Sequence, residues 1–116
     1  MKPFVTLIIL IAFVFCADAQ TIKLLTSGTK TSLRGLSVVS DNIVWASGSS
    51  GMVAKSIDGG ATWKWMTVKG FEKTDFRDIE AFDANTALIM AIAEPAYILK
   101  TTDGGETWKT VYKNEA

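Results

Sequence analysis

One octapeptide occurs twice in this chain, and its spacing restricts the fold more than any other feature of the sequence. The first copy reads Ser-Ile-Asp-Gly-Gly-Ala-Thr-Trp at residues 56–63, and the second reads Thr-Thr-Asp-Gly-Gly-Glu-Thr-Trp at residues 101–108. The two aspartates, Asp58 and Asp103, stand 45 residues apart. A period of about 40 to 50 residues is typical of proteins that stack copies of one small structural unit.

A second pair of matching segments lies upstream of the octapeptides. Residues 33–39 align with residues 76–82, which places Arg34 and Arg77 at one repeat position, 43 residues apart. The two-residue difference from the other spacing is absorbed by residues 93–96, a longer loop in the second copy. A length change that is confined to a loop indicates a structural repeat.

Each copy predicts four short strands. In the first copy they cover residues 33–39, 43–48, 52–57 and 62–68, and in the second copy residues 76–82, 86–92, 97–102 and 107–112. Clusters of Gly, Asp, Asn and Ser separate these segments, as turns require. No segment after residue 20 shows a helical period, so the predicted fold class is all-β.

Four strands in a repeat of this length predict a blade of a β-propeller. One antiparallel sheet cannot cover both of its own faces, and radial stacking buries each face against the next blade. Propellers typically contain about four to eight blades. We therefore expect a partial propeller of two four-stranded antiparallel blades after an N-terminal signal peptide, as an N-terminal fragment, a truncated product or one piece of an assembly.

The N-terminus has the pattern of an export signal. Lys2 precedes an apolar run over residues 4–15, and small residues at Ala17 and Ala19 suit cleavage after Ala19. The run is short for a bilayer span, which needs about 20 residues. The alternatives are an uncleaved anchor and lipidation of Cys16, the single cysteine. Cleavage predicts an exported protein, periplasmic or extracellular, without disulfides.

The predicted organisation is therefore a series of four segments. These are a signal peptide (1–19), an N-terminal strand or linker (20–32), a first blade (33–75) and a second blade (76–116). Residues 21–25 are a candidate strand that belongs to the last blade of a ring and closes it.

Composition excludes several function classes. Twelve basic and twelve acidic residues balance, which argues against nucleic acid as a partner, and against membrane contact beyond the export signal. The absence of histidine excludes His-dependent triads and His metal sites. We expect no metal and no cofactor.

The octapeptide residues have a structural interpretation. An aspartate at a turn start accepts hydrogen bonds from N–H groups one to three residues on, and paired glycines supply positive φ. A hydroxyl two residues before the aspartate adds a bond across the turn, and the tryptophan ring covers it. An active site seldom occurs twice at a fixed period, so we assign a structural role to Ser56, Asp58, Gly59, Gly60, Thr62, Trp63, Thr101, Asp103, Gly104, Gly105, Thr107 and Trp108.

These octapeptides resemble the Asp-box, or bacterial neuraminidase repeat, of β-propellers. Together with an arginine at the start of each repeat, they are similar to the photosystem II stability/assembly factor-like repeat family over residues 33–112. The resemblance implies blade geometry, and it implies a binding patch for a protein partner at the arginine positions. It does not by itself specify a function.

Arg34 and Arg77 are the candidate binding residues. They are the only arginines, and both stand near the start of the predicted innermost strand, which borders the channel of a propeller. Two guanidinium groups around one axis can bind a carboxylate or another anion bidentately. The alternative is structural pairing with an acid of the neighbouring blade, namely Asp75, Asp78 or Glu80.

A sialidase-like glycosidase is the rival interpretation, because such enzymes share Asp-boxes, fold and export. Their substrate carboxylate is held by three arginines, and this chain has two. We predict no catalytic residue. Trp65 is a candidate platform for a sugar, whereas Trp45 is predicted to lie in the core. The sequence favours an exported, non-enzymatic protein-binding or assembly-factor-like module, with carbohydrate as a second possible ligand; the alternative is a fragment of an Asp-box glycosidase.

Overall fold

The computed structural model describes residues 19–26 and 28–115, so the predicted signal peptide up to residue 18 lies outside the described residues. The described chain forms strands and turns without any helix, and so contains no helix long and apolar enough to span a membrane. The prediction of an all-β fold is confirmed.

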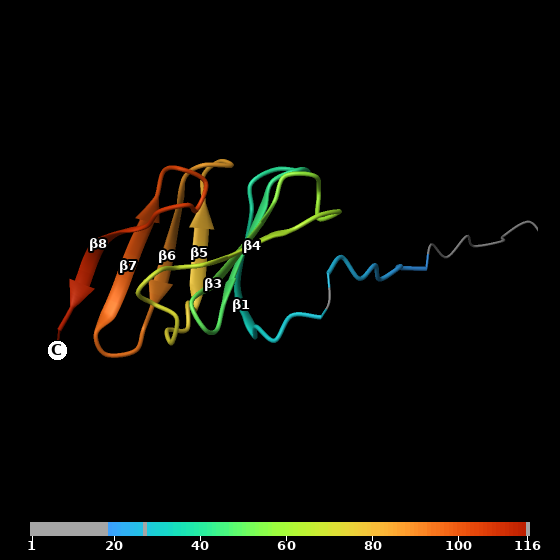
Figure 1. The fold of residues 1–116 in the computed structure, drawn as a ribbon. Helices are drawn as coiled ribbons and strands as arrows, with labels where there is room; N and C mark the ends of the chain where they lie inside the picture. The colour runs from blue at the N-terminus through green and yellow to red at the C-terminus, as the bar shows by residue number, and fades with distance from the viewer. Residues whose placement is uncertain (1–18, 27, 116) are drawn as a thin grey trace, which may run out of the picture.

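Two four-stranded antiparallel sheets form the molecule, and in each the strands pair in chain order (Figure 1). Blade 1 contains β1 (Leu33–Val38), β2 (Val44–Gly48), β3 (Met52–Ser56) and β4 (Lys64–Thr67). Blade 2 contains β5 (Asp78–Ala81), β6 (Ala87–Ala91), β7 (Ala96–Thr101) and β8 (Lys109–Asn114). The two predicted blades are therefore present.

Three strands, β4, β5 and β8, begin two residues later than predicted, for identifiable reasons. Phe76 is fully buried, and its N–H donates to the carbonyl of Gly48 at 3.0 Å, so it bonds to blade 1 before β5 begins. Trp63 and Trp108 belong to the turns, so β4 and β8 each start at the residue that follows the tryptophan.

Residues 21–25, the candidate closing strand, carry no strand in the structure. A strand needs a neighbouring strand to hydrogen-bond with, and residues 21–25 pair with no strand of the two described sheets. Ile22 is fully exposed, while Leu25 is about half-exposed and lies against the position of Gly60.

The core lies between the two blades, where β1 and β2 pack against β5. Trp45 is fully buried there, which confirms its predicted core position, and its ring meets that of Trp108 edge-on at 6.4 Å. Gly35 allows the two backbones to approach closely, because a Cβ atom there would lie 2.9 Å from the amide nitrogen of Ile79. The core residues are Trp45, Val53, Val68, Phe76, Ile79, Ala81, Ala87, Ile89, Ala91 and Leu99.

Buried polar groups of blade 1 bond to the backbone of blade 2. The Ser37 hydroxyl accepts from the N–H of Ala81 at 2.9 Å. The Ser47 hydroxyl donates to the carbonyl of Phe76 at 3.2 Å. Such directional contacts fix how one blade sits on the next, since an unpaired buried polar group is costly.

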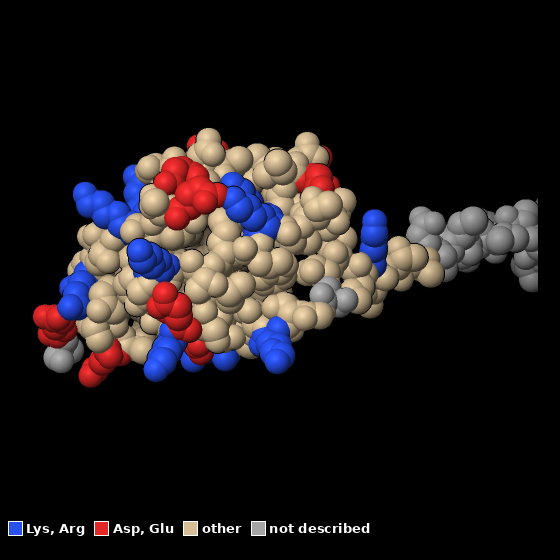
Figure 2. Space-filling model, viewed as in Figure 1, with Lys and Arg blue, Asp and Glu red and all other residues tan. Residues whose placement is uncertain are grey.

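Each blade also has an open face among the described residues. On blade 1, Leu36 and Val38 are 67% and 65% exposed, and on blade 2, Met90 and Tyr112 are 37% and 55% exposed. Basic and acidic side chains are interspersed over the face of the molecule shown in Figure 2, in keeping with the zero net charge.

Candidate functional site

A ring of hydrogen bonds closes the first Asp-box turn. Asp58 accepts through Oδ1 from the N–H of Thr62 and from the Ser56 hydroxyl, both at 2.8 Å, and through Oδ2 from the Thr62 hydroxyl. The Ser56 hydroxyl in turn accepts from the N–H of Gly60 at 2.8 Å. The expected reach of one to three residues was wrong: the carboxylate bonds four residues on, because the paired glycines fold the chain back toward it.

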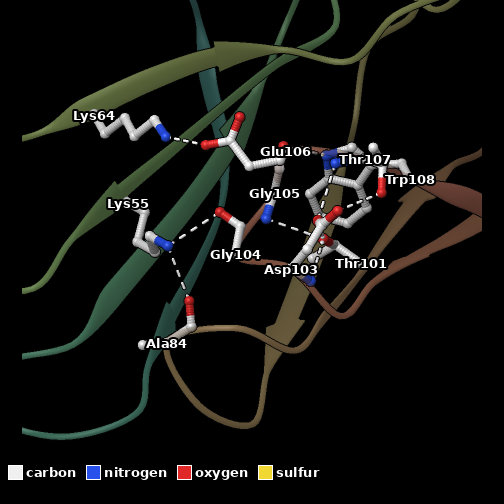
Figure 3. Close-up of polar contacts among 10 residues, drawn as sticks. All are labelled: Lys55, Lys64, Ala84, Thr101, Asp103, Gly104, Gly105, Glu106, Thr107 and Trp108. Atoms are coloured by element: carbon white, nitrogen blue, oxygen red, sulfur yellow. Dashed lines mark hydrogen bonds and ion pairs between the residues drawn. The ribbon is translucent and has the colours of Figure 1, made fainter.

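The second turn repeats this arrangement (Figure 3). Asp103 Oδ1 accepts from the N–H of Thr107 and from the Thr101 hydroxyl, both at 2.9 Å. Gly104 and Gly105 have φ of 77° and 92°, the left-handed region that favours glycine. The indole N–H of Trp108 donates to the carbonyl of Gly105 at 3.2 Å, so the ring covers the turn as expected.

The turn carboxylates are held ionised. Hydrogen bonds from Thr62 lower the pKa of Asp58 to about 2, and those from Thr107 lower the pKa of Asp103 to about 2. A catalytic acid or base needs a pKa near the working pH. Both carboxylates are therefore suited to holding their turns rather than to transferring protons.

Lys55 connects the two blades, a role that the sequence analysis missed. Its ammonium group donates to the carbonyls of Ala84 and Gly104 at 2.9 and 3.0 Å (Figure 3). The same group lies 4.9 Å from the ring centre of Trp45. Burial, then the nearby Lys64, lowers the pKa of Lys55. The available signal was the lysine that directly precedes the octapeptide in both repeats, at positions 55 and 100.

A second lysine also bridges the blades. Lys64 is exposed and forms an ion pair with Glu106 in the turn of blade 2 (Figure 3). An exposed pair of this kind contributes about 0–1 kcal/mol.

Arg34 and Arg77 stand at the same junction between the blades but have different surroundings. Arg34 lies at a bulge in β1, and its Nη2 is 3.8 Å from Oδ2 of Asp75. Of the three acids considered for structural pairing, the structure brings Asp75 to this arginine. The residues that follow the arginines, Gly35 and Asp78, approach each other closely, so the two arginines leave the backbone near one another.

A hollow of about 640 Å³ lies beside this junction. Arg77 and Asp75 line one part, the longer loop of the second repeat lines another, and Tyr97 lies where β7 begins. Phe71 holds the Tyr97 ring edge-on at 5.1 Å between ring centres. The lining residues are Lys73, Thr74, Asp75, Arg77, Ile92, Ala93, Glu94, Pro95 and Tyr97.

Trp65 lies apart from the arginines. It is half-buried on β4 and lines a separate hollow of about 300 Å³ with Gly28, Thr29 and Met52. The two hollows share no lining residue, so Trp65 and Arg77 do not form one site. Within residues 19–26 and 28–115, no group of three or more metal-ligating side chains occurs.

Two sheets that stack face to face, each with an Asp-box turn, define a repeat protein of the β-propeller class. The sequence profile described as "Photosynthesis system II assembly factor YCF48" matches residues 16–116. The chain belongs to this family, and the predicted kinship is confirmed.

Two solved structures are similar to the chain. "YCF48 bound to D1 peptide" is 28% identical, with a TM-score of 0.60 over 74% of this chain. "YCF48 from Cyanidioschyzon merolae" is 26% identical, with a TM-score of 0.59 over 78% of this chain. The matches cover 28% and 29% of those two chains, so this chain spans less than a third of either relative. No curated protein matches the sequence significantly.

Proposed function

We propose that this chain is an exported, non-enzymatic, assembly-factor-like module that binds a peptide segment of a partner protein in the hollow beside Arg77. The observation that carries the proposal is the position of Arg77, which lines a 640 Å³ hollow at the start of an innermost strand. The structure named "YCF48 bound to D1 peptide" supports a peptide as the type of ligand.

The chemistry of the hollow suits a carboxylate next to an apolar side chain. The Arg77 guanidinium can hold a carboxylate through two parallel hydrogen bonds. Ile92, Pro95 and the ring of Tyr97 offer an apolar wall. Asp75, an acid that also lines the hollow, is paired with Arg34. The volume lies within the range of about 300–1,000 Å³ that is usual for ligand pockets.

Two further features support the remaining parts of the proposal. The apolar run over residues 4–15 with Ala17 and Ala19 supports export. The commitment of Asp58 and Asp103 to their turns removes two carboxylates from the candidates for glycosidase chemistry, which needs a pair of them.

The test is binding of a fluorescein-labelled D1 peptide, measured by anisotropy, against the same peptide with its carboxylates converted to amides. We expect the amide version to bind at least about tenfold more weakly, since a charge-assisted bond contributes about 1.5–3 kcal/mol. Arg77→Ala should weaken binding similarly, whereas Lys109→Ala, an exposed lysine on β8, should not.

Several outcomes contradict the proposal. Equal affinity for the two peptides, or unchanged binding by Arg77→Ala, removes the carboxylate site. A loss of thermal stability in Arg77→Ala without a loss of binding makes the arginine structural. Turnover of a fluorogenic sialoside by the purified chain favours the glycosidase instead.

A further inference from the structure

The ladder registers make the contact face of blade 1 equivalent to the open face of blade 2. Both octapeptides define the alignment, and the strand pairings extend it across each sheet. Trp45, Ser47, Val53, Lys55 and Met66 of blade 1, which face blade 2, correspond to Leu88, Met90, Ile98, Lys100 and Tyr112. We call these last five residues the open face of blade 2.

The same registers relate the other two faces. Ile79, Ala81 and Ala87 of blade 2 pack against blade 1, and they correspond to Leu36, Val38 and Val44. Trp65 lies on the same side of blade 1, opposite Ala54. We call Leu36, Val38, Val44 and Trp65 the open face of blade 1. Each open face thus corresponds, by repeat position, to one side of the interface between blade 1 and blade 2.

We propose that a second copy of this chain docks head to tail, with the open face of blade 2 of one copy on the open face of blade 1 of the next. The docking repeats the geometry by which blade 1 sits on blade 2. It covers the exposed apolar side chains Leu36, Val38, Met90 and Tyr112, two on each partner face. The hollow beside Arg77 takes no part, so the proposal is independent of the proposed function.

Polar groups on the open faces are arranged as in the internal interface. Lys55 donates to the carbonyls of Ala84 and Gly104, and in the docked pair Lys100 takes its place, with Asp41 and Gly59 of the next copy as acceptors. An equivalent backbone hydrogen bond ties the acceptor turn in both blades. The Gly59 N–H donates to the backbone carbonyl of Asn42 at 2.9 Å, as the Gly104 N–H does to the backbone carbonyl of Asn85 at 2.9 Å.

Two residues oppose the docking and make it weaker than the internal contact. Asp78 occupies the position of Gly35, where a Cβ atom meets the backbone of the next blade, so the copies stand farther apart at the inner strand. In the internal interface Met66 lies on Gly105, so in the docked pair its equivalent Tyr112 would lie on Gly60 of the next copy. Leu25 already lies on Gly60 and must give way. Asp78→Gly and Leu25→Ser should therefore strengthen association.

The decisive experiment uses two blocked variants in analytical ultracentrifugation. A head-to-tail contact uses different patches on the two partners. Leu36→Asp blocks the open face of blade 1, and Met90→Asp blocks the open face of blade 2. We expect the unsubstituted chain to show a mass above the monomer that rises with concentration, each variant alone to stay monomeric, and an equimolar mixture to form a heterodimer and nothing larger.

Further variants and a folding control sharpen the test. Near-ultraviolet circular dichroism should show both blocked variants folded, since the replaced side chains are exposed. Lys100→Met should weaken association by about tenfold, the loss expected for a charge-assisted bond, and Arg77→Ala should leave it unchanged. The proposal is overturned by an unsubstituted chain that stays monomeric, by a folded blocked variant that still self-associates, or by a mixture that does not pair.

Discussion

Replacement of Lys55 by methionine should destabilise the fold, whereas the same replacement at Lys100 should not. The two lysines hold the same repeat position, but within the described residues only Lys55 packs against another blade. Its ammonium group bonds two carbonyls at 2.9 and 3.0 Å and faces the Trp45 ring. Lys100 is exposed, and its side chain forms no hydrogen bond or ion pair within the described residues.

The magnitude follows from opposing contributions. Hydrogen bonds from a charged donor contribute about 1.5–3 kcal/mol and a cation–π contact about 0.5–1 kcal/mol. Burial of the charge and repulsion by Lys64 act in the other direction, as the lowered pKa of Lys55 shows. Methionine retains most of the apolar stem of the lysine. We therefore expect Lys55→Met to reduce the free energy of unfolding by about 2 kcal/mol, from a total of typically about 5–15 kcal/mol.

The assay is urea unfolding followed by tryptophan fluorescence, at a protein concentration low enough to keep the chain monomeric. A loss of about 2 kcal/mol moves the midpoint by about 0.7–2 M urea, because the slope for a small domain is about 1–3 kcal/mol per molar. Lys100→Met should move it by less than about 0.3 M. Equal shifts for the two variants, or no shift for Lys55→Met, would refute the view that Lys55 joins the blades.

Three further predictions concern the turns and the core. The pKa of Asp58 and Asp103 is about 2 in the fold against 3.8 normally, so the stability that they contribute is complete above about pH 4 and is lost as the pH falls toward 2. When the melting temperature is followed over this pH range, it should fall less in a chain with both Asp58→Asn and Asp103→Asn than in the unsubstituted chain. Equal falls in the two chains would contradict this prediction. Gly35→Ala should cost about 2–3 kcal/mol in urea unfolding by overpacking the junction between blades, and an unchanged midpoint would show that the sheets can separate freely. Trp45→Phe should cost about 2–4 kcal/mol, because it leaves a cavity and removes a 3.1 Å bond to the carbonyl of Asp83; an unchanged midpoint would contradict this.

The fold was predictable because its determinants are local and occur twice. The Asp-Gly-Gly turns and alternating apolar residues specify hairpins without reference to distant residues. The contacts between blades were less accessible. Lys55 reaches Gly104 across 49 residues of sequence, and nothing local to Lys55 indicates its acceptors. The comparison of Lys55 with Lys100 in the two repeats was the available clue.

The candidate site was predictable only in part. Repeat alignment selected Arg34 and Arg77, but it could not show that Asp75 lies 3.8 Å from Arg34 or that Arg77 lines a hollow. That hollow needs the longer loop of the second repeat, residues 93–96, to meet the segment that joins the blades. Whether this loop contacts that segment depends on how the two sheets pack, and the residue pattern of a single strand does not determine their packing.

The compactness of the Asp-box ring has a consequence for the order of events during synthesis. All of its bonds fall within eight consecutive residues, so the entropy lost on closing it is small and closure can be fast. A nascent chain leaves the ribosome from its N-terminus, so the corner at residues 56–63 can close before Gly104 has been translated. Each finished hairpin then offers its successor a surface to fold on, and the temporal sequence of folding follows the spatial sequence of blades.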